Sequence, residues 1–331
     1  MKKEKTNKAT VVVPASSANL GPGFDVFSVA LKEPTLTIYA ELRDDENIRI
    51  VNQGSYASEV STNPEQHSGA QAIKNLLEDK GIRKGFDFVV WVDIPPRKGL
   101  GISGAEAVGF IYAANHILSL NLSEIEIIKY AASAEPGMHL DNVAASALGG
   151  FVITLKDSLL NKLTARKIHP PEDLGFAVII PDIKKTSTAT ARTALPVNVD
   201  VKKHIEAAAR CSLIAYSLAK DDIDLLLEVV SYDPYAEPVR ADTGIYGEGI
   251  NRETLMQEKK ILLERFHVAE TISGAGPSRL LWFRKSENQK TGSERPIDEA
   301  VKLVVRNLEK HGHKAVSIIE TEPSNVGCQL L

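Results

Sequence analysis

The sequence predicts an α+β protein built as one large domain or as two medium domains that share an interface. The chain has 331 residues, a length compatible with either arrangement. Strand-like segments come first along the chain and amphipathic helices follow them, an order typical of α+β folds. Pro170 and Pro171 form the best candidate boundary, so we expect an N-terminal domain over 10–169 and a C-terminal domain over 170–331.

The predicted strands are β-branched runs or segments that alternate between apolar and polar residues. Thr10 to Val13 is a β-branched run that stops at Pro14, so we expect a strand followed by a loop over 16–25. Residues 35–51 alternate as half-buried strands do, and residues 86–94 pass the same test. Further strands are expected over 151–155, 175–180, 278–283 and 315–319.

The predicted helices show apolar residues at helical spacing or a capping signal. In the segment after residues 98–105, apolar residues such as Val108, Ile111 and Tyr112 stand at helical spacing. This spacing predicts a helix that continues to Leu120. Ser123, with Glu126 three residues later, forms a capping-box pattern that starts the next helix, which we expect to end near Glu135. Further helices are expected over 141–148, 201–220, 222–230, 251–266 and 297–311.

Composition and charge exclude several classes of protein. The net charge is -4, hydrophobic residues make up 43% and charged residues 25%, which is typical of soluble globular proteins and not of basic nucleic-acid-coating proteins. No apolar stretch of about 18 residues exists, so no membrane span is expected. The basic first ten residues lack the apolar region of a secretory signal. Two cysteines, Cys211 and Cys328, cannot form a disulfide framework and indicate a reducing compartment, the cytoplasm.

The strongest functional signal is the segment KGLGISGA over 98–105, between a predicted strand and a predicted helix. Glycines allow positive φ and a close approach of the backbone to a ligand. The start of a helix presents unpaired N–H groups and the positive end of the helix dipole to a phosphate. The spacing is neither that of a P-loop nor that of a Rossmann fingerprint. Taken alone, the segment is also compatible with a tight strand–helix connection that uses glycine for packing.

Two further glycine-bearing segments accompany it, PASSANLGPGFD over 14–25 and SGAGPS over 273–278. With these three segments in this order, the chain resembles the GHMP kinases, the family named for galactokinase, homoserine kinase, mevalonate kinase and phosphomevalonate kinase. The first segment is most similar to the homoserine kinases. The other matches to that subgroup are HLDNVA over 139–144, TATAR over 188–192 and EPVR over 237–240.

The resemblance implies a two-lobed α+β fold, with an N-terminal lobe like that of a ribosomal protein, a ferredoxin-like α/β C-terminal lobe and the active site between them. It implies transfer of the γ-phosphate of ATP, with Mg²⁺, to the side-chain hydroxyl of L-homoserine, a step toward threonine. ATP and L-homoserine are therefore the expected partners, and a homodimer is the expected assembly. Neither a nucleic acid nor a membrane is expected as a partner.

The resemblance also implies the roles of individual residues. Those expected to cradle the nucleotide are Pro96, Arg97, Lys98, Gly99, Leu100, Gly101, Ile102, Ser103, Gly104, Ala105, Gly274 and Gly276. Those expected to hold the Mg²⁺ are Ser103 and Glu135. Those expected in the amino-acid pocket are Asn19, Asp25, His139, Arg192 and Arg240. Those expected close to the reacting hydroxyl are Asp141, Asn142, Thr188 and Arg192.

The chemistry of these side chains agrees with an amino-acid ligand. A carboxylate such as Asp25 suits an ammonium group, and the guanidinium groups of Arg192 and Arg240 suit a carboxylate. His139 is expected to contact the substrate rather than to act as a base. Asp141 is open to two interpretations, a general base or a cap of the helix over 142–148.

The chain departs from the family pattern around the second glycine segment. That motif usually reads GLGSSAA, whereas Ile102 and Gly104 replace a serine and an alanine here. Glu106 follows in the first helical turn, where a charge–dipole contact is the simpler interpretation and a metal role the alternative. The segment between Glu135 and Asn142 is shorter than in typical relatives, so Glu106 is the substitute metal ligand if Glu135 cannot reach the metal.

Several points stay open at the level of sequence. His67 and Ser68 stand where relatives often have Asn, so the adenine contacts are not readable. L-threonine or another small hydroxy compound is an alternative acceptor. A non-catalytic kinase homologue is a rival from a different class. The joint presence of five residues argues against it: Ser103, Asn142, Thr188, Arg192 and Arg240. A nucleic-acid-binding module is the weakest alternative, because no basic stripe with interleaved aromatic residues is present.

Overall fold

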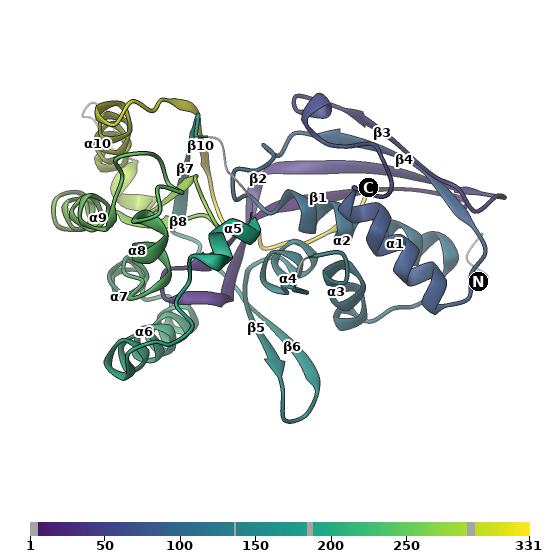
Figure 1. Cartoon of the computed structure of the whole chain (residues 1–331), viewed down its shortest axis with the longest axis horizontal. Coiled ribbons are helices and arrows are strands. Elements are labelled where there is room, and N and C mark those ends of the chain that lie inside the picture. The colour runs from purple at the N-terminus through teal and green to yellow at the C-terminus, as the bar shows by residue number, and fades with distance from the viewer. Residues whose placement is uncertain (1–5, 136, 184–187, 290–294) are drawn as a thin grey trace.

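The protein consists of two β-sheets, each covered by helices (Figure 1). The structure is a computed structural model that describes residues 6–135, 137–183, 188–289 and 295–331. The strand order of the first sheet is β11-β1-β2-β4-β3, with β5 paired to β2 and β6 paired to β5. The strand order of the second sheet is β10-β7-β9-β8. The predicted α+β class is confirmed.

The first sheet and its helices make up the N-terminal lobe. Its strands are β1 (Lys8–Leu20), β2 (Gly23–Arg43), β3 (Ile48–Gln53), β4 (Gly85–Val92), β5 (Phe151–Asp157), β6 (Lys162–Ile168) and β11 (Gln329–Leu330). The helices that lie below this sheet in Figure 1 are α1 (Ser68–Asp79), α2 (Ile102–Leu118), α3 (Glu124–Ala132) and α4 (Asp141–Leu148). Of these, α2 and α4 pack directly on β1.

The second sheet and its helices make up the C-terminal lobe. Its strands are β7 (Leu174–Pro181), β8 (Ala269–Ile272), β9 (Arg279–Arg284) and β10 (Ala315–Thr321). Its helices are α6 (Val201–Lys220), α7 (Ile223–Val230), α8 (Ala236–Ala241), α9 (Arg252–Phe266) and α10 (Pro296–Lys310). The short helix α5 (Thr188–Thr193) lies between the two lobes in Figure 1.

Side chains of the two lobes meet in one continuous core. Phe151 of β5 stacks on Trp282 of β9 with 5.7 Å between ring centroids, and Phe176 of β7 meets the same indole edge-on at 4.9 Å. The last residues of the chain return to the first sheet, because β11 pairs with β1. The domain division at 169/170 therefore stays a prediction, since this shared core crosses it.

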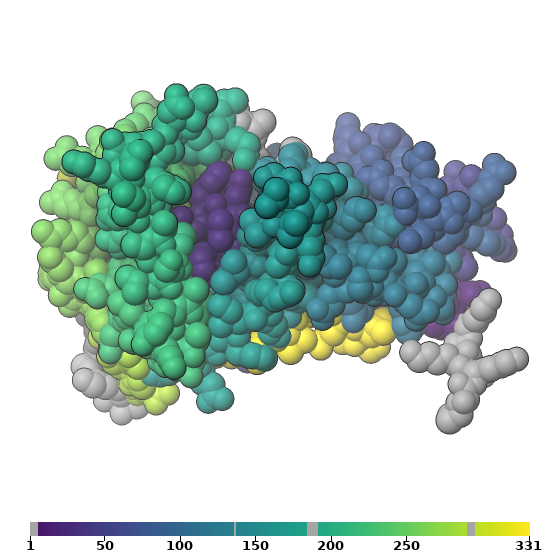
Figure 2. Space-filling view, turned by 90° about the horizontal axis from the view of Figure 1, so that it is seen from below, coloured from purple at the N-terminus to yellow at the C-terminus, as the bar shows by residue number. Residues whose placement is uncertain are grey.

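The turn between β1 and β2 extends into the C-terminal lobe. Gly21 has φ +54° and lies so close to Val230 that a Cβ on Gly21 would come within 2.2 Å of the Val230 carbonyl oxygen. In the space-filling view, N-terminal residues are visible between the helices of the C-terminal lobe and the rest of the N-terminal lobe (Figure 2). The first glycine segment is thereby placed at the junction of the two lobes.

Strand β1 is longer than the sequence predicted. The expected end at Pro14 is wrong, because β1 continues to Leu20 and pairs with β2 on both sides of the proline. A register shift between Pro14 and Ser16 accommodates the missing N–H of the proline within the ladder. The expected loop over 16–25 is therefore mostly strand, interrupted by a turn at residues 21–22.

Local signals predicted the helices unevenly. The capping box of Ser123 and Glu126 is confirmed, although α3 ends at Ala132 rather than near Glu135. Helix α4 begins and ends where the sequence predicted. Helix α1 was not predicted, although Ala70, Ile73 and Leu77 are buried at helical spacing. No helix within the described ranges combines the length and the apolar character needed to cross a membrane.

Candidate active site

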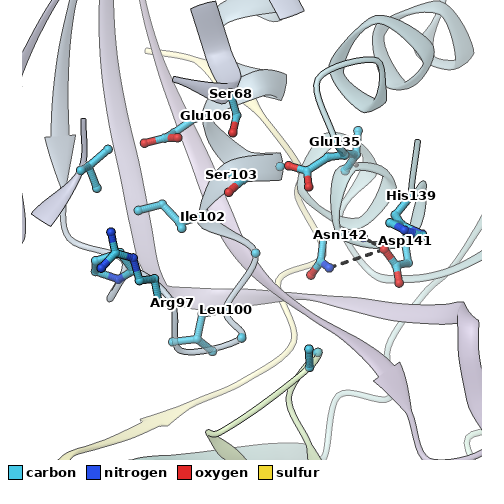
Figure 3. Close-up of a pocket in the computed structure, with 18 of the residues that line it drawn as sticks. Ser68, Arg97, Leu100, Ile102, Ser103, Glu106, Glu135, His139, Asp141 and Asn142 are labelled. Carbon is cyan, nitrogen blue, oxygen red and sulfur yellow. Dashed lines mark hydrogen bonds between the residues drawn. The ribbon is translucent and has the colours of Figure 1, made fainter. Parts of the chain in front are cut away.

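A cavity of about 550 Å³ is lined by residues from both lobes. The structure brings many of the predicted site residues to its wall: Asn19, Asp25, Pro96, Arg97, Gly99, Leu100, Gly101, Ile102, Ser103, Gly104, Glu135, His139, Asp141, Asn142, Arg192, Arg240 and Gly274. Wall residues that were not among the predicted site residues are Glu59, Val60, Ser61, Gln66, His67, Ser68, Glu106, Val143 and Ala275. Figure 3 shows the centre of this cavity.

The glycine loop, residues 96–101 between β4 and α2, passes through positions where a side chain has no room. Gly99 and Gly101 have φ +80° and +68°. A Cβ on Gly99 would come within 2.1 Å of the Ser273 carbonyl oxygen, and one on Gly101 within 2.1 Å of Ser16 Oγ. Gly101 is the N-cap of α2, so this helix begins at the wall of the cavity. Its first N–H groups and the positive end of its dipole suit an anion such as a phosphate.

Three residues expected at the nucleotide do not line the cavity. Lys98 points away from it, because its ammonium group donates to the carbonyl oxygens of Pro181 (2.7 Å) and Ile183 (3.0 Å) and so fastens the glycine loop to the end of β7. Ala105, in the first turn of α2, is fully buried in the core. Gly276 faces Tyr246, whose ring would lie 2.8 Å from an added Cβ.

The turn around Gly274 lies against the glycine loop. Ser273 Oγ donates to the Gly99 carbonyl oxygen at 2.8 Å. Asn19, with φ +59°, joins this turn to the β1–β2 turn: its Nδ2 donates to the Gly274 carbonyl oxygen and its Oδ1 accepts the N–H of Asp25, both at 3.0 Å. Through these two hydrogen bonds, Asn19 fixes the position of Asp25 relative to the glycine loop.

Charged side chains gather at the other end of the cavity. Arg192 Nη2 contacts both carboxylate oxygens of Asp25 at 2.9 Å and His139 Nδ1 at 3.0 Å. The guanidinium groups of Arg192 and Arg240 both lie over the ring of Phe24, at 5.3 and 5.0 Å from its centroid. Arg240 is 3% exposed, and its Nε donates to the Ala191 carbonyl oxygen. The ring of Phe24 thus lies against two guanidinium groups that stand near the Asp25 carboxylate. Two positive charges and one negative charge in this arrangement suit a zwitterion.

Asp141 and Asn142 lie between these two ends (Figure 3). The N-cap of α4 is Leu140, so Asp141 is the first helical residue and not the cap. Asp141 Oδ1 accepts the N–H of Asn142 at 2.7 Å. Burial, together with the charge of Asp25, raises the pKa of Asp141 to about 6. Burial lowers the pKa of His139, although the charge of the neighbouring Asp25 opposes this shift. The lowered pKa keeps the imidazole neutral near pH 7.

The amide of Asn142 has a defined orientation. Ser16 Oγ donates to Asn142 Oδ1 at 3.0 Å, which leaves the Nδ2 group on the side of Asp141, 3.5 Å from Asp141 Oδ1. Ser16 is fully buried, and its own N–H donates to the Leu100 carbonyl oxygen of the glycine loop. Ser16 was not among the predicted site residues. Only its position in the first glycine segment pointed to it.

Side chains with oxygen atoms that could bind a cation lie near the start of α2. Ser103 and Glu135 both line the cavity, and in Figure 3 the carboxylate of Glu135 points toward the start of α2, where Ser103 lies. Glu106 lies on the other side of Ser103 in this view. Burial, together with the charge of Glu135, raises the pKa of Glu106 to about 8. A hydroxyl and carboxylates are the ligands that a hard divalent cation prefers.

The predicted residue Thr188 begins α5, the helix that carries Arg192. Its side chain lies outside the part of the chain that the structure describes. Glu59 and Gln66 come from the segment before α1 and complete the wall near the glycine loop. No sequence signal marked them, because the segment between β3 and α1 meets the glycine loop only in the folded chain.

Comparisons with known proteins agree with this geometry. The model of the GHMP kinases N terminal domain matches residues 68–150. The chain is 34% identical to a homoserine kinase of Methanococcus maripaludis, over 82% of this chain and 86% of that protein. It is 30% identical to a homoserine kinase of Thermoplasma volcanium, over 83% and 84% of the two chains.

Solved structures show the same fold. The crystal structure of a homoserine kinase from Cytophaga hutchinsonii superposes with a TM-score of 0.82 at 22% identity, covering 100% of this chain and 99% of that one. The crystal structure of L. major mevalonate kinase superposes with a TM-score of 0.66 at 15% identity, covering 98% of this chain and 99% of that one. The two-lobed fold expected from the three glycine segments is thus confirmed.

Proposed function

The chain belongs to the GHMP kinase family, and from this premise we propose that it transfers the γ-phosphate of ATP to the side-chain hydroxyl of L-homoserine, giving ADP and O-phospho-L-homoserine. One observation carries the proposal. A single cavity combines a helix start suited to phosphates with a carboxylate and two guanidinium groups suited to an amino acid.

The acceptor end fits a small zwitterion with a free hydroxyl. The Asp25 carboxylate would take the ammonium group, and the guanidinium groups of Arg192 and Arg240 would take the carboxylate. Asp25 and Arg192 are bonded to each other in this structure. A zwitterion can replace that ion pair with two equivalent ones, so that neither charged side chain is left uncompensated when the ligand binds.

The nucleotide end fits a triphosphate. The N–H groups at the start of α2 and the glycine loop would contact the phosphate oxygens, with Arg97 on the same wall. Ser103 and Glu135 fit a Mg²⁺ ion, because they place a hydroxyl and a carboxylate on the same part of the cavity wall. The ion would neutralise part of the negative charge of the phosphates during transfer.

The reacting hydroxyl would lie near Asp141 and Asn142. Asn142 Nδ2, oriented by Ser16, would donate to the transferred phosphoryl group or to the acceptor oxygen. The hydroxyl proton passes either to Asp141 or to the phosphate itself while the new O–P bond forms and ADP leaves. Asp141 suits the first route, because its pKa of about 6 leaves it ionised at neutral pH.

A coupled assay of ADP release tests the proposal. Purified protein is given ATP and Mg²⁺ with L-homoserine, L-threonine, L-serine or mevalonate, and L-homoserine is expected to give the highest kcat/KM. Equal or faster turnover of L-threonine would replace the proposed acceptor. ATP binding without ADP release for any of the four compounds would favour a non-catalytic homologue.

Family membership also guides the proposals about cellular context. We place the reaction in threonine biosynthesis, in the cytoplasm, where the free thiols of Cys211 and Cys328 would stay reduced. We propose a homodimer as the working assembly, which light scattering of the purified protein would test.

A further inference from the structure

Glu106 is an acidic side chain of the cavity that the proposed reaction does not use. It follows Ser103 by three residues on α2, so the two side chains project from one face of the helix. Glu106 is 4% exposed and lines the cavity. Its Oε1 has no hydrogen-bond partner among the described residues. A carboxylate buried in this way is costly unless something compensates it.

His67 lies beside Glu106 but offers it neither a positive charge nor a good hydrogen bond. His67 Nδ1 accepts the N–H of Gly69 at 3.1 Å, so the ring proton is on Nε2. That atom lies 3.5 Å from Glu106 Oε1, beyond a good hydrogen bond, and has no other partner among the described residues. Burial lowers the pKa of His67 to about 4, so the ring is neutral at pH 7.

The nucleotide end of the cavity has more acidic than basic side chains. Glu59, Glu106 and Glu135 line it, whereas Arg97 is the basic residue among the described residues of that wall. Arg192 and Arg240 belong to the acceptor end, where Asp25 and Asp141 balance them. A triphosphate adds further negative charge beside these carboxylates, so a single Mg²⁺ leaves a negative excess at this end.

We propose that Glu106 holds a second divalent cation, beside the one assigned to Ser103 and Glu135, so that the protein binds its nucleotide with two cations. The inference rests on the proposed function, since a polyphosphate must occupy this end of the cavity. In Figure 3 the carboxylates of Glu106 and Glu135 lie on opposite sides of Ser103, which provides one carboxylate for each ion. One carboxylate is enough, because Mg²⁺ completes its shell with phosphate oxygens and water.

Counting bound Mn²⁺ tests this proposal without any turnover. Free Mn²⁺ is followed by electron paramagnetic resonance while the protein is titrated in the presence of a saturating, non-hydrolysable β,γ-imido analogue of ATP. The wild-type chain is expected to bind two Mn²⁺ ions. Glu106→Gln is expected to bind one, with the other weakened at least tenfold, because an amide is a much poorer ligand than a carboxylate.

Glu59→Gln is the matched control, since it removes a carboxylate from the exposed rim of the same cavity and is expected to keep two ions. One Mn²⁺ per wild-type chain, or two in a folded Glu106→Gln chain, overturns the proposal. The wild-type count is decisive even if Glu106→Gln does not fold. Turnover of L-homoserine with one bound ion would refute this inference alone. Two bound ions without turnover of any acceptor would refute the proposed function alone.

Discussion

Asp141 is a 4% exposed residue of the cavity wall, and its surroundings set the pH range in which its carboxylate can accept a proton. Burial and the charge of Asp25 raise its pKa, whereas the N–H of Asn142 and the charge of Arg192 lower it, with a net value of about 6. The interpretation of Asp141 as a helix cap is wrong, because Leu140 has the N-cap position. The role of a general base stays a prediction.

That role has a defined pH signature. Only the ionised carboxylate accepts a proton, so kcat should rise with pH through about 6 and level off above it. Asp141→Asn should remove this rise and lower kcat by about 10² to 10⁴ fold, the usual value of such catalysis. The measurement is kcat against pH for both proteins at saturating substrates. A loss of only a few fold would exclude the base and favour direct passage of the proton to the phosphate.

At the scale of elements, the glycine loop allows a neighbouring side chain to pack against it where a larger residue would collide. Gly101 ends the loop at the N-cap of α2, and its missing Cβ leaves space for Ser16 Oγ, which orients Asn142. A side chain at this position would push Ser16 away from Asn142. The loop therefore positions a group near the acceptor as well as the backbone that faces the phosphates.

Gly101→Ala should lower kcat and weaken nucleotide binding by at least about tenfold, which corresponds to roughly 1.4 kcal/mol. Gly312→Ala is the matched control, because Gly312 also has positive φ (+82°) but an added Cβ there meets nothing within 4 Å. Both variants carry the backbone cost of about 1 kcal/mol, but only Gly101→Ala carries the collision. Kinetics and thermal unfolding of the two are compared, and equal kinetic losses would contradict the argument.

At the scale of the whole molecule, a buried ion pair links the two ends of the site. Glu237 of α8 pairs with Lys259 of α9, and both side chains are at most 4% exposed. The other oxygen of Glu237 accepts the N–H of Ile272 at 2.8 Å, directly before the turn around Gly274. Helix α8 also carries Arg240. The ion pair therefore fixes the position of the acceptor end of the cavity relative to its nucleotide end.

Lys259→Met should destabilise the protein by about 3–5 kcal/mol, because it leaves the Glu237 charge buried without a partner. Adding Glu237→Gln should recover much of that loss, since glutamine is uncharged and still accepts the N–H of Ile272. The free energies of unfolding of both variants are measured in urea against the wild type. A double variant no more stable than Lys259→Met would show that the pair itself, rather than the orphaned charge, stabilises the fold.

Sequence patterns predicted those elements whose signals are local. The capping box at Ser123, the helix over 141–148 and the helix over 201–220 are each encoded by residues within a few turns of one another, and all three are confirmed. The continuation of β1 through Pro14 depends on pairing with β2, and the place of β5 in the first sheet depends on pairing with the same strand. Local propensity does not contain that information.

The sequence by itself determined the family, the fold class and the segments that meet at the cavity, because a glycine with positive φ and a helix start are recognisable from neighbouring residues. Only the tertiary structure decided which side chains touch. Asn19 and Gly274 are separated by 255 positions, and Ser16 and Asn142 by 126. It also turned Lys98 away from the cavity and placed Glu106 beside His67, because each side chain takes the partner that the packed lobes bring to it.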